Sequence, residues 1–540
     1  MTFVNPTRTT AEHRQAHLNW MGGLSYTLSN PLHRLRMAAS SCFFGEPMYY
    51  HRDRGDRRPV RHQPASRLSD AQVVHLRETL GAMDPQEWRG LSPAELMERA
   101  IDEALAHDPE ATLQEAVRLR HEEHIRTTPQ VILVRAAHHA SVRGTGWVRQ
   151  YGRRIIARAD EPAVGLAYQL HRFGKPVPNA LKKAWRDALE RFDDYQLAKY
   201  RLENRAIKTV DVVNLVHPRS EAVDRLVRGQ LKTTDRTWEA IISASGSNAE
   251  AWTRAVDVMG HMALLRNLRN LVKVGLDPEV FVQRLVDGAK RGKQLPFRYY
   301  SAHRALGSEA PKAVLKGVER CLKASLGNLP TFQGRVMSLC DNSGSAHGTT
   351  TSSMGTMTIA SIANLTAVLT AMNSEEGHVG VFGDRLEVFP VDAARKTSVF
   401  THLKRAERLG KGIGGGTENG IWLFWDRAIR EAEHWDAVFV YSDMQAGHGG
   451  LFGTNPKAYS DYRWGGSGQH IDVPRLIKDY RRKVNPEVKV FLVQVAGYQD
   501  TIVPEFYDRT WILGGWGEGL LRFAASMSAW SEATPSADRT

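Results

Sequence analysis

The chain has 540 residues, with 72 lysines and arginines against 59 aspartates and glutamates and a net charge of +13. Hydrophobic residues make up 42% of the sequence and include 13 tryptophans, which excludes a chain that is disordered throughout. At about 100–200 residues per domain, this length predicts two or three domains.

Composition also bears on the compartment. No run of 18 apolar residues predicts a transmembrane helix, and residues 1–17 lack the apolar stretch of a secretory signal. The cysteines Cys42, Cys321 and Cys340 are too scattered for a disulfide framework or a CxxC zinc site. We therefore expect a cytoplasmic protein with no membrane partner.

Residues 1–330 are predicted to be helical. In residues 178–194 one helix face carries the apolar side chains Leu181, Ala184, Trp185, Ala188, Leu189 and Phe192. In residues 218–229, Ser220 is placed to cap a helix that Gly229 ends. Short segments of this kind, separated by prolines, predict an α-solenoid of paired helices, and a compact irregular helical domain explains them nearly as well.

The basic excess belongs to this half. Residues 1–330 carry 51 basic and 36 acidic side chains, a net charge of +15, whereas residues 331–540 carry 21 and 23, a net charge of −2. The asymmetry favours one domain that binds a polyanion and one that does not. A generally basic proteome is the alternative explanation.

Residues 331–530 alternate strands with helices. The predicted strands are residues 335–340, 378–383, 437–442 and 488–495, and the predicted helices are residues 357–373, 398–410, 421–435 and 473–484. Apolar strands alternating with helices predict an α/β domain with a doubly wound parallel sheet. We expect residues 531–540 to be a flexible tail.

Oxygen-bearing side chains follow the predicted strands. Asp341, Ser343 and Ser345 come directly after one strand, Thr417 lies in a glycine-rich loop before a helix, and Asp443 ends another strand. Ligands of open α/β sheets bind at the carboxyl ends of strands, and such a set of oxygens suits a hard cation, above all Mg²⁺. Capping of helices and turns by the same residues is the alternative.

The order and spacing of these five residues resemble the metal-ion-dependent adhesion site of von Willebrand factor A domains. The resemblance implies that the second half folds as such a domain. In that family a partner's carboxylate fills the open position of the ion, so the site usually binds and does not catalyse.

Four segments resemble the TROVE module of Ro ribonucleoproteins. Residues 181–218 resemble its core, residues 28–50 its N-terminal signature, residues 262–271 a third segment and residues 295–302, more loosely, a fourth. Together with GGGT and YSD in the second half, the resemblance covers nearly the whole chain. It implies a multidomain protein, in which an all-α ring of HEAT-like helical repeats precedes the von Willebrand factor A domain.

The same resemblance implies the partners. Ro proteins bind small noncoding Y RNAs on the outer surface of the ring, and single-stranded 3′ ends of misfolded or structured RNAs enter the central hole. Bacterial relatives associate through a Y RNA with a 3′ exoribonuclease, polynucleotide phosphorylase. We expect these partners and a monomeric protein.

The candidate RNA contacts are basic side chains that can pair with phosphates. They are Lys182, Lys183, Lys199, Arg201, Arg205 and Lys208. The resemblance adds His217, for which a role in capping a helix is equally open. A second basic set is better explained as a solvated helix face, and comprises Arg149, Arg153, Arg154 and Arg158. Tyr195 and Tyr200 could stack on bases, but we expect both in the core.

We therefore predict a noncatalytic RNA-binding protein that acts in RNA quality control or processing and holds a divalent cation. The alternative is a cation-dependent adhesion adaptor, whose A domain binds a carboxylate of a partner protein. A metal-dependent nuclease is disfavoured, because one cation with hydroxyl ligands lacks the paired carboxylates of two-metal cleavage.

Overall fold

The computed structural model forms two compact units. It describes residues 16–18, 24–27, 30–40, 46–47, 49, 93–200, 205–231, 237–292, 294–344, 346–347, 357–391, 397–414, 420–444, 463–464, 470–471, 473–495, 500–501, 509–514 and 524. The helical unit comprises Pro129–Leu329 with Ser398–Phe400, and the sheet unit comprises Met1–Thr128, Pro330–Thr397 and Thr401–Thr540. The predicted domain limits at 330 and 530 stay predictions, and the fold groups the residues before 129 with the sheet.

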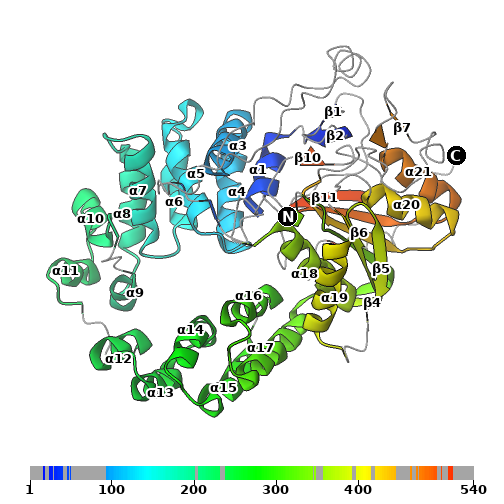
Figure 1. Cartoon of the computed structure of the whole chain (residues 1–540). Coiled ribbons are helices and arrows are strands. Elements are labelled where there is room, and N and C mark those ends of the chain that lie inside the picture. Colours follow the sequence, from blue (N-terminus) through cyan, green and yellow to red (C-terminus); the bar gives the residue numbers. More distant parts are fainter. Residues whose placement is uncertain are drawn as a thin grey trace. The chain divides into compact units, whose positions relative to one another are not determined.

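The helical unit is a series of short helices, coloured from cyan to green in Figure 1. They are α5 (Thr127–His138), α6 (Trp147–Ile155), α7 (Glu161–Arg172), α8 (Asn179–Leu189), α9 (Asp194–Lys199), α10 (Thr209–Val216), α11 (Glu221–Val227), α12 (Trp238–Ser245), α13 (Ala249–Val258), α14 (His261–Lys273), α15 (Pro278–Arg291), α16 (Pro296–Leu306) and α17 (Lys312–Ser325). Short 3₁₀ turns lie at Ala140–Val142 and Leu326–Asn328. No helix in the described part of the chain is long and apolar enough to cross a membrane.

Helix α8 follows from its sequence. The apolar side chains predicted for its inner face are fully buried, namely Leu181, Ala184, Trp185, Ala188 and Leu189. The predicted limits of α11 are also confirmed, because the Ser220 hydroxyl accepts a hydrogen bond from the Val223 N–H at 3.2 Å and Gly229 follows with a φ of +68°. Apolar periodicity therefore determines which face of α8 is buried, and capping determines where α11 begins and ends.

A close approach joins α6 to α8. A Cβ atom on Gly152 of α6 would lie 2.7 Å from the Cβ of Ala184 in α8, closer than two such atoms can come. The glycine therefore permits direct backbone packing of the two helices. This contact brings the polar face of α6 beside Asp187 of α8.

The sheet unit is built around six strands. They are β3 (Phe332–Asp341), β4 (Ser374–Phe382), β5 (Leu386–Pro390), β6 (Ala437–Ser442), β9 (Lys489–Gln494) and β11 (Thr510–Gly514), in the order β11-β9-β6-β3-β4-β5. The four predicted strands are confirmed, and they pair in parallel. The prediction of an entirely parallel sheet is wrong at one edge, because the short turn at 383–385 returns β5 antiparallel to β4.

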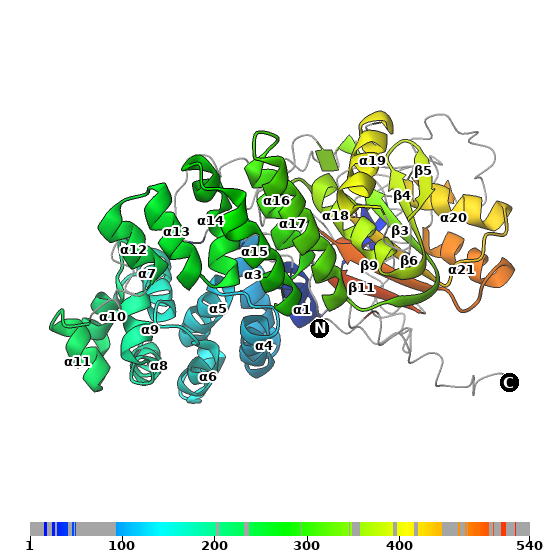
Figure 2. The same cartoon turned by 90° about the horizontal axis from the view of Figure 1, so that it is seen from below.

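Helices cover both faces of this sheet, as Figure 2 shows from below. The unit contains α18 (Ile359–Met372), α19 (Val399–Gly412), α20 (Gly420–Arg430) and α21 (Val473–Lys483). Alternate residues of β3 and β6, such as Met337 and Val438, join α20 and α21 in one core. On the opposite face the hydroxyl groups of Tyr441 in β6 and Thr370 in α18 lie 2.5 Å apart. The predicted doubly wound arrangement is therefore present.

The sheet unit also contains small strands and three N-terminal helices. The strands are β1 (Ala16–Leu18), β2 (Leu24–Thr27) and β10 (Asp500–Thr501) in one small sheet, and β7 (Arg463–Trp464) and β8 (His470–Ile471) in another. The helices are α1 (Pro31–Ser40), α3 (Pro93–His107) and α4 (Pro109–His121). Met37 of α1 is part of the same buried core as α20 and α21, so this helix completes the sheet unit.

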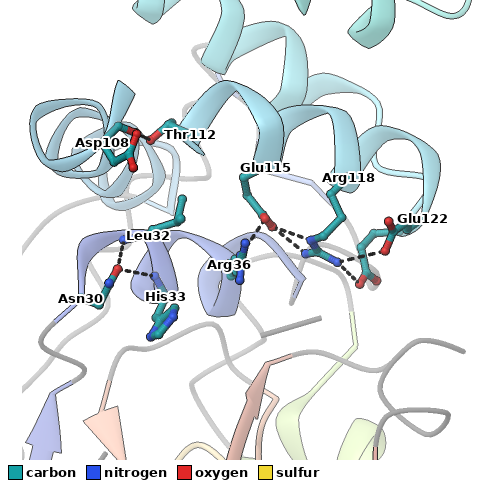
Figure 3. A network of polar contacts seen from close by, with 10 residues as sticks. Asn30, Leu32, His33, Arg36, Asp108, Thr112, Glu115, Arg118 and Glu122 are labelled. Carbon is teal, nitrogen blue, oxygen red and sulfur yellow. Dashed lines mark hydrogen bonds and ion pairs between the residues drawn. The ribbon is translucent and has the colours of Figure 1, made fainter. Parts of the chain in front are cut away.

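A network of charges ties α1 to α4, as Figure 3 shows. The side chain of Glu115 is fully buried and accepts hydrogen bonds from Arg36 Nε at 2.7 Å and Arg118 Nε at 2.8 Å. Arg118 also contacts Glu123 at 2.9 Å. Each buried guanidinium and carboxylate thus has a partner of opposite charge, which is the condition for burying such groups.

Candidate nucleic-acid interface

A basic pocket of about 900 Å³ opens between α6, α8 and the end of α10. We call it the arginine pocket; its lining consists of Arg149, Arg153, Arg186, Asp187, Glu190, Arg191, Val216, His217 and Arg219. Five guanidinium groups thus face two carboxylates. The pocket carries a net positive charge suited to anions that offer several oxygen atoms.

Asp187 organises the arginines on one wall. Arg149 binds it in a bidentate pair, with Nε 2.6 Å from Oδ2 and Nη2 3.2 Å from Oδ1. Arg153 donates from Nε to the same Oδ2 at 3.0 Å. The carboxylate side chain is only 6% exposed, whereas the side chains of Arg149 and Arg153 are 44% and 55% exposed. Each arginine therefore keeps donors directed to solvent while its orientation is fixed.

The ionisation of this cluster follows from these contacts. Burial raises the pKa of Asp187, but the hydrogen bonds and charges of Arg149 and Arg153 outweigh burial, so that its pKa lies below the usual value. The hydrogen bond to Asp187 likewise raises the pKa of Arg149. The Asp187 carboxylate and the Arg149 guanidinium are therefore charged at any physiological pH.

Arg191 and Glu190 fix the floor of the pocket to the ends of neighbouring helices. Arg191 donates to the carbonyl oxygen of Arg153 at 2.7 Å and to that of Ile156 at 2.9 Å, at the C-terminal end of α6. Glu190 accepts a hydrogen bond from the backbone N–H of Arg219 at 2.9 Å. These bonds satisfy a helix end and hold the residues after α10 against α8.

His217 has one of the two roles that the sequence left open, the capping of a helix, and its role as an RNA contact stays a prediction. It caps α10, with a left-handed φ of +48° and its N–H 2.9 Å from the Val213 carbonyl oxygen. Its exposed side chain lines the arginine pocket. A residue other than glycine is strained in this conformation, and such strain often lies at functional positions.

The other described members of the predicted RNA contacts lie on or between the helices α8, α9 and α10. Lys182 and Lys183 lie on α8, Lys199 ends α9, and Arg205 and Lys208 precede α10. Arg201 lies outside the described residues. Of the members of this set that the structure describes, His217 alone lines the pocket, and the assignment of all seven stays a prediction.

Two arginines of the set expected on a solvated helix face line the arginine pocket. Arg149 and Arg153 were better explained as a solvated face, but they line the pocket, since Asp187 lies opposite them on α8. Their spacing of four residues places both on one helix face, and this is the sequence feature that could have predicted a shared site. Nothing in the sequence paired them with a carboxylate 34 to 38 positions away.

The core assignment of two tyrosines is also corrected. Tyr195 is 50% exposed, and Tyr200 is partly exposed. Lys199 donates a hydrogen bond to the Tyr195 hydroxyl at 3.1 Å, and the Arg158 guanidinium lies 4.2 Å from the centre of the Tyr200 ring. Because α9 has only six residues and buries only Leu197, it leaves Tyr195 at the surface.

In the sheet unit, the described metal candidates lie at the strand ends, as predicted. Asp341 ends β3, Ser343 follows it, and Asp443 follows β6, its neighbour in the sheet. All three are buried. Ser345 and Thr417 lie outside the described residues. Among the described residues, no group of three or more His, Cys, Asp or Glu side chains is placed to hold a metal ion.

Asp341 is a buried carboxylate that neutral groups hold in place. It is 2% exposed, with Oδ1 accepting from the Ser343 N–H at 2.9 Å and Oδ2 from the Ser442 hydroxyl at 2.6 Å. Burial raises its pKa although these hydrogen bonds act in the opposite direction. A cation beside the carboxylate would offset the cost of burying its charge.

Comparison with known proteins finds a family model that matches part of this chain. The family model of the TROVE domain matches residues 228–326, a stretch that contains α14 and α16. This stretch of the chain is therefore similar to a TROVE domain. The TROVE resemblance seen at residues 262–271 and 295–302 falls within the matched stretch.

Two further comparisons find proteins that are similar to this chain. A stretch of 77 residues is 36% identical to telomerase protein component 1 of Rattus norvegicus, and 74 residues are 36% identical to that of Mus musculus. These matches cover 13% and 12% of this chain, and the chain spans about 3% of either telomerase protein. The crystal structure of the Deinococcus radiodurans RO (RSR) protein is similar in fold, with a TM-score of 0.54 and 16% identity over 79% of this chain and 93% of that one.

Proposed function

We propose that this chain is a noncatalytic RNA-binding protein of the TROVE family, and that it holds RNA phosphates in the arginine pocket. The observation that carries the proposal is the pairing of several half-exposed arginines with one buried aspartate. Such arginines are oriented before a ligand arrives, so that binding costs little side-chain entropy. Phosphate oxygens match the forked geometry of guanidinium groups.

The finer proposal concerns which RNA binds and where. We infer that a Y-type small noncoding RNA binds the outer surface of a HEAT-like ring at this pocket, with Lys182, Lys183, Lys199, Arg201, Arg205, Lys208 and His217 as further contacts. Single-stranded 3′ ends of misfolded or structured RNAs would occupy the central hole, in a role in RNA quality control. The TROVE-domain match at residues 228–326, the similarity in fold to the Deinococcus radiodurans RO (RSR) protein and the net charge of +15 over residues 1–330 support this proposal. A 3′ exoribonuclease such as polynucleotide phosphorylase is the proposed protein partner.

Filter binding tests this proposal with the full chain and a structured RNA that carries a single-stranded 3′ tail. Arg219→Gln is the sharpest variant, because Arg219 lines the pocket and its side chain forms no hydrogen bond or ion pair with the described residues. It should weaken binding, and the slope of log affinity against log salt should fall by about 0.7 to 0.9 for each lost phosphate contact. Arg482→Gln, on an exposed arginine of α21, is the matched control.

An RNA affinity that does not depend on salt concentration, or that falls equally in both variants, would contradict the proposal that RNA binds in the arginine pocket. Incubation of the protein with Mg²⁺ and labelled RNA tests the noncatalytic part of the proposal. Intact RNA is expected, and cleavage products would overturn it.

We also propose that the sheet unit is a von Willebrand factor A domain that holds one Mg²⁺ ion. Asp341, Ser343, Ser345, Thr417 and Asp443 would be its ligands, and the buried carboxylate of Asp341 with its neutral donors supports this choice. Mg²⁺ should raise the melting temperature of the full chain, because a ligand that binds only the folded state stabilises it. EDTA should reverse the rise, and Asp341→Asn should not respond to Mg²⁺.

The same site supports a second candidate function, a cation-dependent adaptor that binds the carboxylate of a partner protein. If the protein is such an adaptor, it should bind a polypeptide only when Mg²⁺ is present. This binding should be lost in Asp341→Ala and should not change when RNA is added. Loss of RNA binding in Arg219→Gln with intact metal binding would favour the RNA proposal.

A further inference from the structure

An exposed tyrosine lies beside the arginine pocket in a cationic setting. Tyr195 stands in the first turn of α9 and is 50% exposed. The Nζ atom of Lys199, four residues later, lies 5.3 Å from the centre of its ring and 5.7 Å from that of Tyr200. The Arg158 guanidinium covers the Tyr200 ring at 4.2 Å. We call Tyr195, Lys199, Tyr200 and Arg158 the tyrosine platform.

The backbone beneath the platform is fixed at both ends of the helix. Asp193 and Gln196 form a reciprocal capping box, with the Gln196 N–H 2.7 Å from Asp193 Oδ1. Arg225 of α11 pairs with Asp194 at 2.8 Å, and the carbonyl oxygen of Tyr200 accepts from the Thr209 hydroxyl at 2.7 Å. The ring of Tyr195 is thus presented on a braced element, and its hydroxyl is held by Lys199. An exposed aromatic ring so restrained loses little freedom when a flat ligand stacks on it.

The platform adjoins the pocket. Arg191, which lines the pocket, precedes Tyr195 by four residues, so their Cα atoms lie within about 14 Å. Arg191 binds the carbonyl oxygen of Ile156 on the segment that leads to Arg158, whose side chain covers Tyr200. A chain with phosphates in the pocket would therefore pass close to the Tyr195 ring.

We propose that Tyr195 is a stacking site for an unpaired nucleobase of an RNA strand whose phosphates occupy the arginine pocket. This inference rests on the proposed function and names the substrate class of that site as RNA with a single-stranded segment. Unpaired bases of RNA stack on aromatic side chains, and this contact tolerates any base because every base has a flat face. Lys199 and the pocket arginines hold the flanking phosphates.

An RNA ligand is favoured over an acidic protein by the composition of the platform. The site combines a half-exposed ring with cations in ring contact, as single-strand binding surfaces do. An aromatic anchor for a protein partner would instead lie in an apolar, well-packed patch. The sequence neighbours Asp194 and Gln196 of Tyr195 are charged or polar, and Lys199 contacts both its hydroxyl and its ring.

The test uses the full chain and a hairpin RNA whose single-stranded tail carries 2-aminopurine, a base analogue whose fluorescence falls when it stacks. The wild-type protein should bind the RNA and quench the probe at one or more tail positions. Tyr195→Ala should lose the quenching and weaken binding by roughly 5-fold to 100-fold. Tyr195→Phe keeps the ring and should retain quenching, whereas Tyr195→Leu keeps only apolar bulk and should lose it. Unchanged melting temperatures show that these surface variants fold.

The outcomes separate this inference from the proposed function. Tight binding of the wild type with no quenching, or equal affinity and quenching in Tyr195→Ala, overturns the stacking site and leaves the arginine pocket intact. Full affinity in Tyr195→Leu would mean that the ring provides only an apolar contact, and this would also overturn the stacking proposal. A wild-type protein that binds no RNA fails the proposed function itself. Displacement of the RNA by polyglutamate as readily as by single-stranded RNA would favour a protein ligand and overturn the choice of substrate class.

Discussion

Arginines pair with a carboxylate in both units, but the environments of the two pairs differ. In the sheet unit, Glu115 is fully buried between Arg36 and Arg118, whose side chains are 23% and 13% exposed. In the helical unit, Asp187 is buried beneath arginines that are about half exposed. In the first cluster the guanidinium groups are largely buried and stabilise the fold. In the second they keep N–H donors exposed to solvent, where the proposed ligand could bind them. Burial of the cation, more than the presence of an ion pair, distinguishes a structural cluster from a binding site.

The largest effect should come from Glu115→Ala. Removing this carboxylate leaves the largely buried Arg118 without its main partner, and breaking a buried pair costs about 3–5 kcal/mol. Urea unfolding of the full chain, followed by tryptophan fluorescence, measures the change. Glu122→Ala on the same helix is the control and should cost little, because its side chain is 67% exposed and 4.0 Å from Arg118. Equal stability of the two variants would contradict the claim that the buried Glu115 cluster stabilises the fold.

Asp187→Asn should have an intermediate effect on stability and a clear effect on RNA binding. The substitution adds one positive charge, so a purely electrostatic surface would bind RNA more tightly. We expect weaker binding, because Arg149 and Arg153 lose the carboxylate that orients them. Filter binding over a salt series measures this, with Asp426→Asn beside Arg430 as the control of equal charge change. Tighter binding by Asp187→Asn would show that orientation does not matter.

The stability that the Asp187 cluster contributes should also depend on pH. Because the folded-state pKa of Asp187 is depressed, its stabilising contribution is complete above its unfolded value of about 4 and is lost as pH falls through the lower folded value. The difference in unfolding midpoint between wild type and Asp187→Asn should be constant from pH 8 to pH 5 and shrink below about pH 4. A difference that already vanishes near pH 6 would contradict the assigned pKa direction.

The smallest change in stability should come from His217→Gly. Glycine adopts the left-handed conformation of this cap without strain, so that stability should stay equal or rise by up to about 1 kcal/mol. RNA affinity should fall because the imidazole leaves the pocket. His124→Gly is a matched control, since His124 has a φ of +57° and lies in the sheet unit. Loss of RNA affinity in both variants would remove His217 from the site.

Local sequence patterns determined much of this protein. The buried face of α8, the cap at Ser220, the four central strands and the polar residues at the ends of β3 and β6 could all be read from spacing, because helix and strand periodicity and capping act over a few residues. The TROVE resemblance likewise depends on short segments, two of which lie in the matched stretch.

Only the tertiary structure decided which charged residues form a site. Arg149 and Asp187 are 38 positions apart and meet because Gly152 lets α6 rest directly on α8. The antiparallel β5, the exposure of Tyr195 and the entry of Met37 into the core of the sheet unit depend equally on contacts between distant segments. Periodicity specifies which face of a helix is buried, but the neighbour against which that face packs is set by shape and volume in the folded chain, and these decide whether an arginine faces a carboxylate or only water.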